Sequence, residues 1–268
     1  MNIEEIVKGL ENRGYEVRAD EFEKGGIKKT GIVFMIGDVQ PIIYVDENST
    51  ADSVADAYEN GKDKADEVRN SIGSLRDFEK VRDKIRLAVR PVIDDTNIIA
   101  RPFLDLQSYC YINEKSFSCK IKKNVLDLWG ITEDELFELA MTNTKNDIIV
   151  KTMNEIVAEI MMCDVDELAQ PPIPMYVVMT RSKIYGSSVM LLNDKLSEVA
   201  NMLDDDLVII PSSVHEIIVI PKAYCENVAE IKDMIMQVND SEVEDEDVLS
   251  SHPYEYSRED NEVLALAV

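Results

Sequence analysis

Residues 211–216 bring together the side chains that serine hydrolases use. The segment reads Pro-Ser-Ser-Val-His-Glu and holds one of only two histidines in the chain. A nucleophilic serine needs a base within hydrogen-bonding reach and donors that stabilise an oxyanion. Ser212 or Ser213, with His215 as the base and an acid from a distant segment, would form a hydrolytic site. One hypothesis for this chain is therefore a hydrolase.

The same residues also suit a turn. They connect two β-branched runs, DLVII and EIIVIP, over a length that is ordinary for a hairpin. Adjacent strand residues point to opposite faces, which separates a serine from a histidine close to it in sequence. The G-x-S-x-G elbow of many hydrolases is also missing, because Gly186-Ser187-Ser188 lacks its second glycine. We predict a turn here and keep the hydrolase as the alternative.

A metal site would have to depend on carboxylates. His215-Glu216 begins like the helix of a zinc protease, but Val219 stands where the second histidine is needed. The triple acid Asp204, Asp205 and Asp206 could hold Mg²⁺ or Ca²⁺ weakly. A solvated helix end before a strand explains the three acids better. We predict no metal site, with the triple acid as the weak alternative.

Cofactor and redox motifs are missing from the sequence. None of the ten glycines is spaced as G-x-G-x-x-G or as a Walker loop, so we predict no nucleotide cofactor. The four cysteines lie far apart and contain no C-x-x-C pair. We expect four free thiols, which fits a reducing compartment.

The charge balance restricts the partners of the chain. Among 268 residues there are 53 acids and 28 bases, a formal net charge of −25. Phosphate backbones need clustered Lys and Arg, so direct nucleic-acid binding is disfavoured. Anionic membranes are repelled as well, and we expect no membrane association. An acidic surface steers a protein toward cationic surfaces, so a basic protein is the expected partner. The sequence leaves the oligomeric state open.

The start of the chain does not resemble a targeting signal. Its first residues, MNIEEIVKGLENRGYEV, have acids where a signal peptide needs bases, and no apolar core follows. No apolar run approaches the roughly 18 residues of a spanning helix. We predict a cytoplasmic protein that begins at Met1.

Three parts of the chain show paired strand-like runs followed by a helical pattern. The pairs are TGIVFMIGD with QPIIYVDE, FLDLQSYCYI with SFSCKI, and PMYVVMTR with SSVMLL. This order predicts an α+β fold of antiparallel sheets with packed helices, in three hairpin–helix units. The expected segments are an N-terminal α+β unit, a middle hairpin–helix unit, a C-terminal α+β unit and an acidic C-terminal segment, at residues 1–92, 93–170, 171–237 and 238–268. Whether these units share one core stays open.

Several helices and the acidic segment can be placed from their patterns. Thr132 and Glu135 form a capping box that begins a helix. Residues 75–90 carry apolar side chains at spacings of three and four, which predicts a second helix, and we expect another helix at residues 145–162. In the acidic segment, Leu249, Tyr254 and Tyr256 could dock on the body, with His252 in the docking loop.

Several stretches together resemble a known family. They are GIVFMIGDVQPIIYVDE, VLDLWGITEDELFELAMTN, MYVVMTRSKIYGSSVML, IIPSSVHEIIVIP and VNDSEVEDEDVLSSHPYEYS. In this order they resemble an uncharacterised bacterial domain-of-unknown-function family, typical of anaerobic Gram-positive gut bacteria. The Trp-Gly-x-[ST]-x-x-x-Leu helix entrance is also similar to a second uncharacterised bacterial family. The resemblance implies a bacterial cytosolic protein and brings no known activity and no catalytic residues.

The leading hypothesis is a non-enzymatic acidic protein that binds or regulates a basic partner. The missing catalytic motifs, the two histidines and the charge of −25 favour it. The alternative is the hydrolase that uses Ser212 or Ser213 and His215.

Overall fold

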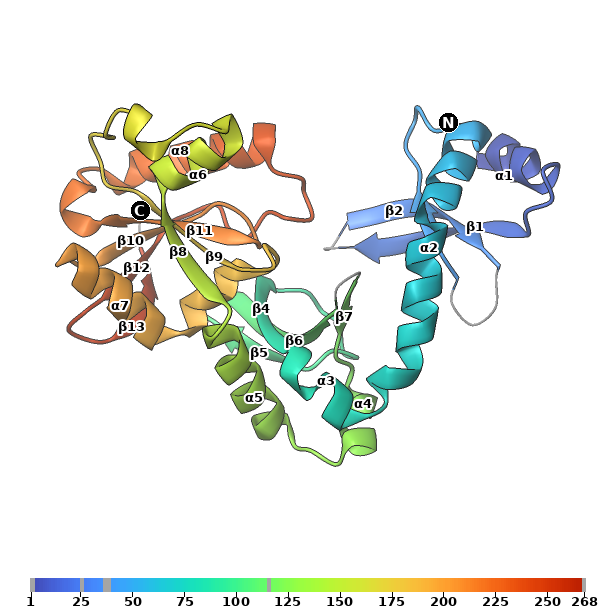
Figure 1. Cartoon of the computed structure of the whole chain (residues 1–268), viewed down its shortest axis with the longest axis horizontal. Helices are drawn as coiled ribbons and strands as arrows, with labels where there is room; N and C mark the ends of the chain where they lie inside the picture. Colours follow the sequence, from blue (N-terminus) through green and yellow to red (C-terminus); the bar gives the residue numbers. More distant parts are fainter. Residues whose placement is uncertain (1–2, 25–26, 36–39, 115–116, 267–268) are drawn as a thin grey trace. The chain divides into compact units, whose positions relative to one another are not determined.

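The computed structural model describes residues 3–24, 27–35, 40–114 and 117–266 (Figure 1). The chain forms two compact units. One consists of Met1–Val81 and Glu114–Ser118, and the other of Arg82–Asn113 and Cys119–Val268. Helices pack on antiparallel sheets in both units, which confirms the predicted α+β class.

The first unit is a small sheet covered by two helices. Its elements are α1 (Ile3–Glu11), β1 (Val17–Lys24), β2 (Ile27–Phe34), β3 (Ile42–Tyr44), α2 (Ala51–Leu75) and α3 (Phe78–Val81). The strands run antiparallel in the order β1-β2-β3. Leu10, Phe34 and Tyr58 form the centre of its core, where the rings of Phe34 and Tyr58 stack at 4.0 Å. The pairing of β2 with β3 confirms the first predicted hairpin, whose turn at Gly37-Asp38 lies outside the described residues.

A second sheet forms one part of the larger unit. It contains β4 (Ile85–Pro91), β5 (Ala100–Phe103), β6 (Leu106–Asn113) and β7 (Ser118–Lys120), with β6 between β4 and β5 and β7 also paired to β6. The helical elements η1 (Arg82–Lys84), α4 (Lys123–Trp129) and α5 (Glu133–Lys145) accompany it. Thr132 caps α5 with the predicted capping box. At the edge of the sheet, Thr144 of α5 accepts a hydrogen bond from the Leu87 N–H at 2.8 Å.

The third sheet has six strands in the order β13-β12-β10-β11-β9-β8. The strands are β8 (Ile148–Thr152), β9 (Tyr176–Thr180), β10 (Leu207–Pro211), β11 (Glu216–Pro221), β12 (Tyr254–Ser257) and β13 (Glu262–Ala265). They come from the segments 93–170, 171–237 and 238–268, so these parts of the chain share one core. Leu249, Tyr254 and Tyr256 are buried, as expected for an acidic segment that docks.

Helices cover both faces of the six-stranded sheet. They are α6 (Met153–Met161), η2 (Val165–Glu167), η3 (Gly186–Leu191), α7 (Asn193–Leu203), η4 (Lys222–Tyr224) and α8 (Val228–Glu242). On one face, Met190 of η3 and Leu196 of α7 pack against alternate strand residues such as Ile209. On the other face, Ile235 of α8 packs against Val208. Figure 1 shows α6 and α8 on the same side of this sheet.

Three predicted elements are wrong, each for the same reason. Residues 85–90 of the predicted helix 75–90 form β4, and residues 148–152 of the predicted helix 145–162 form β8. The predicted strand SSVMLL is the 3₁₀ helix η3, so it does not pair with β9, which lies between β11 and β8. All three segments are short and apolar, and tertiary packing decides their conformation.

No helix among the described residues has the length and apolar character that a bilayer crossing requires.

A glycine at the start of η3 allows a close approach of two backbone segments in the larger unit. The Gly186 N–H donates to the His215 carbonyl at 2.8 Å. A Cβ at this position would collide with that carbonyl oxygen and lie 2.7 Å from Met179 Cα and 2.8 Å from Thr180 N. All three neighbours are backbone atoms, which cannot move without displacing β9 or the hairpin.

We therefore expect Gly186→Ala to lower the free energy of unfolding of the larger unit by about 2–3 kcal/mol through overpacking. Urea unfolding followed by the fluorescence of Trp129, the single tryptophan of the chain, measures this change. The matched control is Gly61→Ala in α2 of the other unit, where a Cβ meets no atom within 4 Å. It should leave the Trp129 transition unchanged; equal transitions for Gly186→Ala and the wild type would contradict the argument.

Candidate functional site

The segment 211–216 forms a turn whose histidine is held on both sides. Strands β10 and β11 pair in the register Pro211↔Ile217, which confirms the predicted hairpin. His215 Nδ1 accepts a hydrogen bond from the Tyr185 backbone N–H at 3.2 Å. His215 Nε2 lies 3.2 Å from Asp247 Oδ1. A neutral imidazole with its proton on Nε2 satisfies both contacts, so both ring nitrogens are engaged.

The two serines of this turn do not contact the imidazole nitrogens. Ser213 Oγ accepts a hydrogen bond from the His215 backbone N–H at 3.0 Å, which stabilises the turn. In a catalytic triad, one ring nitrogen accepts the serine proton while the other donates to the acid. Here the nitrogen opposite Asp247 already accepts from the Tyr185 backbone. The geometry therefore gives Ser212 and Ser213 no base, and the hydrolase hypothesis gains no support from it.

The triple acid at the end of α7 faces protein donors. Asp204 Oδ1 pairs with Arg258 Nη1 at 3.1 Å, and Asp206 Oδ1 accepts from the Arg258 N–H at 2.9 Å. Asp205 Oδ2 accepts from the Ala223 N–H at 2.7 Å. Within the described parts of the chain, no group of three or more His, Cys, Asp or Glu side chains could hold a metal ion. The three carboxylates join the end of α7 to η4 and to the residue after β12.

His252 also makes a structural contact. Its Nε2 lies 3.0 Å from Asp105 Oδ2, and the Tyr254 hydroxyl donates to Asp105 Oδ1 at 2.9 Å. These contacts attach the start of β12 to the turn between β5 and β6. His215, Ser213 and His252 thus each make hydrogen bonds that hold the fold together.

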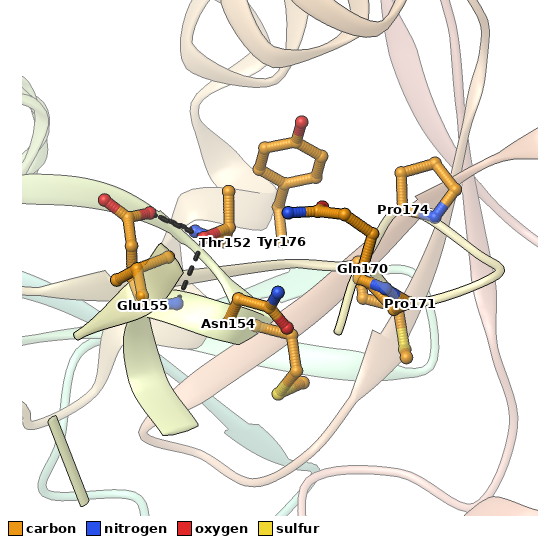
Figure 2. A pocket seen from close by; sticks show the side chains of 10 residues that line it. Thr152, Asn154, Glu155, Gln170, Pro171, Pro174 and Tyr176 are labelled. Atoms are coloured by element: carbon orange, nitrogen blue, oxygen red, sulfur yellow. Dashed lines mark hydrogen bonds between the residues drawn. The ribbon is translucent and has the colours of Figure 1, made fainter. Parts of the chain in front are cut away.

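The structure places a pocket elsewhere, at the start of α6 (Figure 2). Its volume is about 430 Å³, and it lies between the α6 N-terminus and the proline-rich segment before β9. The lining residues are Thr152, Met153, Asn154, Glu155, Val165, Gln170, Pro171, Pro174, Met175 and Tyr176. The sequence signalled only the rigid break of Pro171, Pro172 and Pro174, and gave no sign that it borders a helix start.

Hydrogen bonds fix one wall of the pocket. Thr152 Oγ1 accepts from the Glu155 N–H at 3.1 Å, and Glu155 Oε2 accepts from the Thr152 N–H at 2.6 Å. Asn154 Nδ2 donates to the Ala169 carbonyl at 3.2 Å, and the Met153 N–H donates to the Met175 carbonyl at 2.9 Å. The proline-rich segment is therefore tied to the first turn of α6, and the pocket is preformed.

The pocket lining is half apolar and half polar, and Glu155 is its one acidic residue. The Thr152 N–H that Glu155 accepts lowers the pKa of that carboxyl, so it stays ionised. The two carboxamides Asn154 and Gln170 and the phenol of Tyr176 are the other polar side chains besides Thr152, and none of the ten lining residues is Lys, Arg or His. The ten lining residues contain no cysteine, serine or histidine.

The other end of α6 exposes apolar side chains. Ile160 is 74% exposed, Met161 64% and Met162 94%. Met162 caps the helix with φ 53°, a left-handed conformation in which glycine or asparagine is usual. A nine-residue helix is about 14 Å long, so these residues lie about that far from the pocket, at the opposite end of α6. We call the pocket lining together with Ile160, Met161 and Met162 the α6 surface.

The stretch of chain that contains α6 is acidic. Between residues 151 and 170 the chain holds one base, Lys151, which pairs with Glu159. The acids of this stretch are Glu155, Glu159, Asp164, Asp166 and Glu167. The α6 surface thus combines exposed apolar side chains with an acidic stretch of chain.

Comparison with known proteins identifies a family and no relative of known function. A family model described as "Family of unknown function (DUF5688)" matches residues 1–258. No curated protein and no solved structure matches the chain.

Replacing His215 tests the role of the turn. We expect His215→Ala to lower the free energy of unfolding by about 1–2 kcal/mol, because the Tyr185 N–H loses its acceptor. In a screen with ester, peptide and phosphate substrates, His215→Ala and the wild type should show the same background hydrolysis. His252→Ala serves as the control for loss of a histidine elsewhere. Turnover by the wild type that His215→Ala abolishes and His252→Ala retains would contradict the structural role.

Proposed function

Because this chain belongs to a family of unknown function (DUF5688), its role has to be argued from its own surface, and we propose that it is a non-enzymatic protein-binding module. Its partner is a basic amphipathic helical segment of another protein, bound at the α6 surface. The proposal places this binding in the bacterial cytoplasm, where the four free cysteines stay reduced.

One observation carries the proposal: a single short helix has a pocket at its start and three exposed apolar residues at its end, in a stretch of chain that holds five acids and one base. Exposing Ile160, Met161 and Met162 to water is unfavourable unless a partner covers them. Methionine suits such a surface because its flexible, polarizable side chain adapts to different partners. The exposed apolar residues and the pocket would take the apolar face of a helix, as in other helix-binding grooves.

The charges define the other face of the partner. Of the acids near the α6 surface, Glu159 pairs with Lys151, and Glu155 remains ionised in the pocket lining. Lysine or arginine residues along the flanks of the bound helix would complement these acids. Such pairs contribute more to the association rate and to selectivity than to affinity, and salt weakens them. The net charge of −25 acts in the same direction at longer range.

Two exposed methionines provide the first test. We expect the double variant Met161→Glu, Met162→Glu to weaken binding of a labelled Leu/Lys amphipathic helical peptide at least about tenfold, measured by fluorescence anisotropy. The added glutamates increase the attraction for lysine, so a loss can only come from the apolar contact. The matched control is Met202→Glu in α7, where the methionine is 57% exposed.

Binding of the wild type should also weaken as salt rises, and a Leu/Glu peptide of the same length should not bind. The proposal fails if the Leu/Lys peptide does not bind, if Met202→Glu weakens binding as much as the double variant, or if affinity is independent of salt.

A cation placed in the pocket provides the second test. Gln170 is an exposed lining residue, so Gln170→Arg should preserve the fold while it repels a lysine that approaches the pocket. We expect the anisotropy titration to show severalfold weaker binding of the same peptide. Gln237→Arg in α8 adds the same charge at another exposed position and should have a smaller effect. Equal weakening by both variants would mean that net charge alone, and not the pocket, attracts the peptide.

A further inference from the structure

One face of the sheet formed by β4 and β6 carries cationic and phenolic side chains. The strands pair in the register Arg86↔Tyr111, Ala88↔Tyr109 and Arg90↔Gln107. Alternate strand residues point to the same side, so these six residues share a face. Ala88, Tyr109 and Tyr111 pack there with Ile184 and Tyr185 from the loop after β9. We call it the β4/β6 face.

Arg90 is buried on this face without a counter-ion. Its residue is 6% exposed, and both Nε and Nη2 are buried and have no hydrogen-bond partner. The guanidinium carbon lies 4.8 Å from the centre of the Tyr109 ring. A buried, unpaired charge costs several kcal/mol, so native structures rarely keep one without a purpose.

The unpaired atoms of Arg90 have a specific geometry. In a guanidinium group, Nε and Nη2 point their N–H bonds in parallel along one edge. That edge matches two oxygens of a carboxylate or a phosphate, which is the reason arginine binds these groups bidentately. The two nitrogens without a partner in Arg90 are thus the pair that would hold an oxyanion.

Arg101 on β5, the strand on the other side of β6, is a second arginine of this sheet and differs from Arg90. Its guanidinium carbon lies 4.0 Å from the centre of the Phe137 ring, so it also stacks on an aromatic side chain. Unlike Arg90, it pairs with a carboxylate, that of Asp134. Stacking on a ring therefore does not explain why Arg90 lacks an acid.

The neighbours of Arg90 also favour an anion. The Tyr111 hydroxyl is buried and unpaired, and it can donate a hydrogen bond. Burial raises the pKa of Tyr109, so its ring stays neutral beside Arg90. Lys120 Nζ lies 5.6 Å from the centre of the same ring. The carboxylate of Asp147 forms an ion pair with Arg86, with Asp147 Oδ2 3.8 Å from Arg86 Nε.

We infer that Arg90 is the anchor of a binding site for a small ligand that carries a carboxylate or phosphate group. The ligand would supply the two acceptors that Arg90 Nε and Nη2 lack. Both nitrogens are shielded from water, so the ligand must displace a covering side chain when it enters. This site is separate from the α6 surface and adds a small-molecule ligand to the proposed protein partner.

Thermal unfolding in the presence of simple anions tests the inference. Trp129 is buried in α4 of the same unit, and its fluorescence reports the midpoint. Inorganic phosphate and acetate are titrated separately, with sodium chloride keeping the ionic strength constant. We expect one of them to raise the wild-type midpoint in a saturable way, by about 2–4 °C well above its Kd. The anion with the larger shift identifies the group that the site prefers.

Two Arg90 variants and one control make the outcome specific. Arg90→Met removes the charge, and Arg90→Lys keeps it but loses the parallel N–H pair, so neither should show the anion-dependent shift. Arg101→Met removes the paired, ring-stacked arginine and should retain it. If Arg90→Met does not fold, Arg90→Lys decides. The inference is overturned if neither anion raises the wild-type midpoint beyond chloride, or if both folded Arg90 variants retain the shift.

Discussion

The larger unit depends on the contact between Gly186 and the backbone of His215. At this point the loop after β9 touches the turn of the β10–β11 hairpin with no side chain between them. Three further hydrogen bonds act on the same turn: Tyr185 donates to the His215 ring, Ser187 to the Val214 carbonyl, and Val214 to the Asp247 carbonyl. One turn therefore fixes two segments that are distant from it in sequence, residues 185–187 and the backbone at Asp247. His215, whose side chain could have done chemistry, serves this structural purpose.

The rigid centre leaves other parts of the unit available for binding. Strand β8 is an edge of the six-stranded sheet, and α6 follows it directly, so the α6 surface lies away from the central hairpin. The β4/β6 face is a second such place. It is closed by the loop of residues 181–185, whose final residue, Tyr185, also contacts His215. A substitution or a ligand at the β4/β6 face would thus contact the same loop that is hydrogen-bonded to the turn.

Patterns with strong local causes were predictable, whereas short apolar segments were not. The hairpin at residues 207–221 and the capping box of Thr132 follow from β-branched runs and from side-chain to backbone hydrogen bonds. β4 and β8 each lie next to a helix in the sequence. The spacing of their apolar residues is compatible with a helix as well as with a strand. Only the pairing of β4 with β6 and of β8 with β9 decides for the strand. In a strand these partners supply the backbone hydrogen bonds that a helix would form within itself.

The sequence by itself determined the α+β class, the acidic charge, the central turn and membership of a family of unknown function. Each depends on composition or on residues close together in the chain. The tertiary structure alone decided where a ligand or partner could bind. The pocket forms because Thr152 and Pro174, which are distant in sequence, line the same space. That the guanidinium of Arg90 is buried without a hydrogen-bond partner can be seen only from the residues packed around it. Burial and the absence of a hydrogen-bond partner are properties of packing between distant segments, which no local pattern encodes.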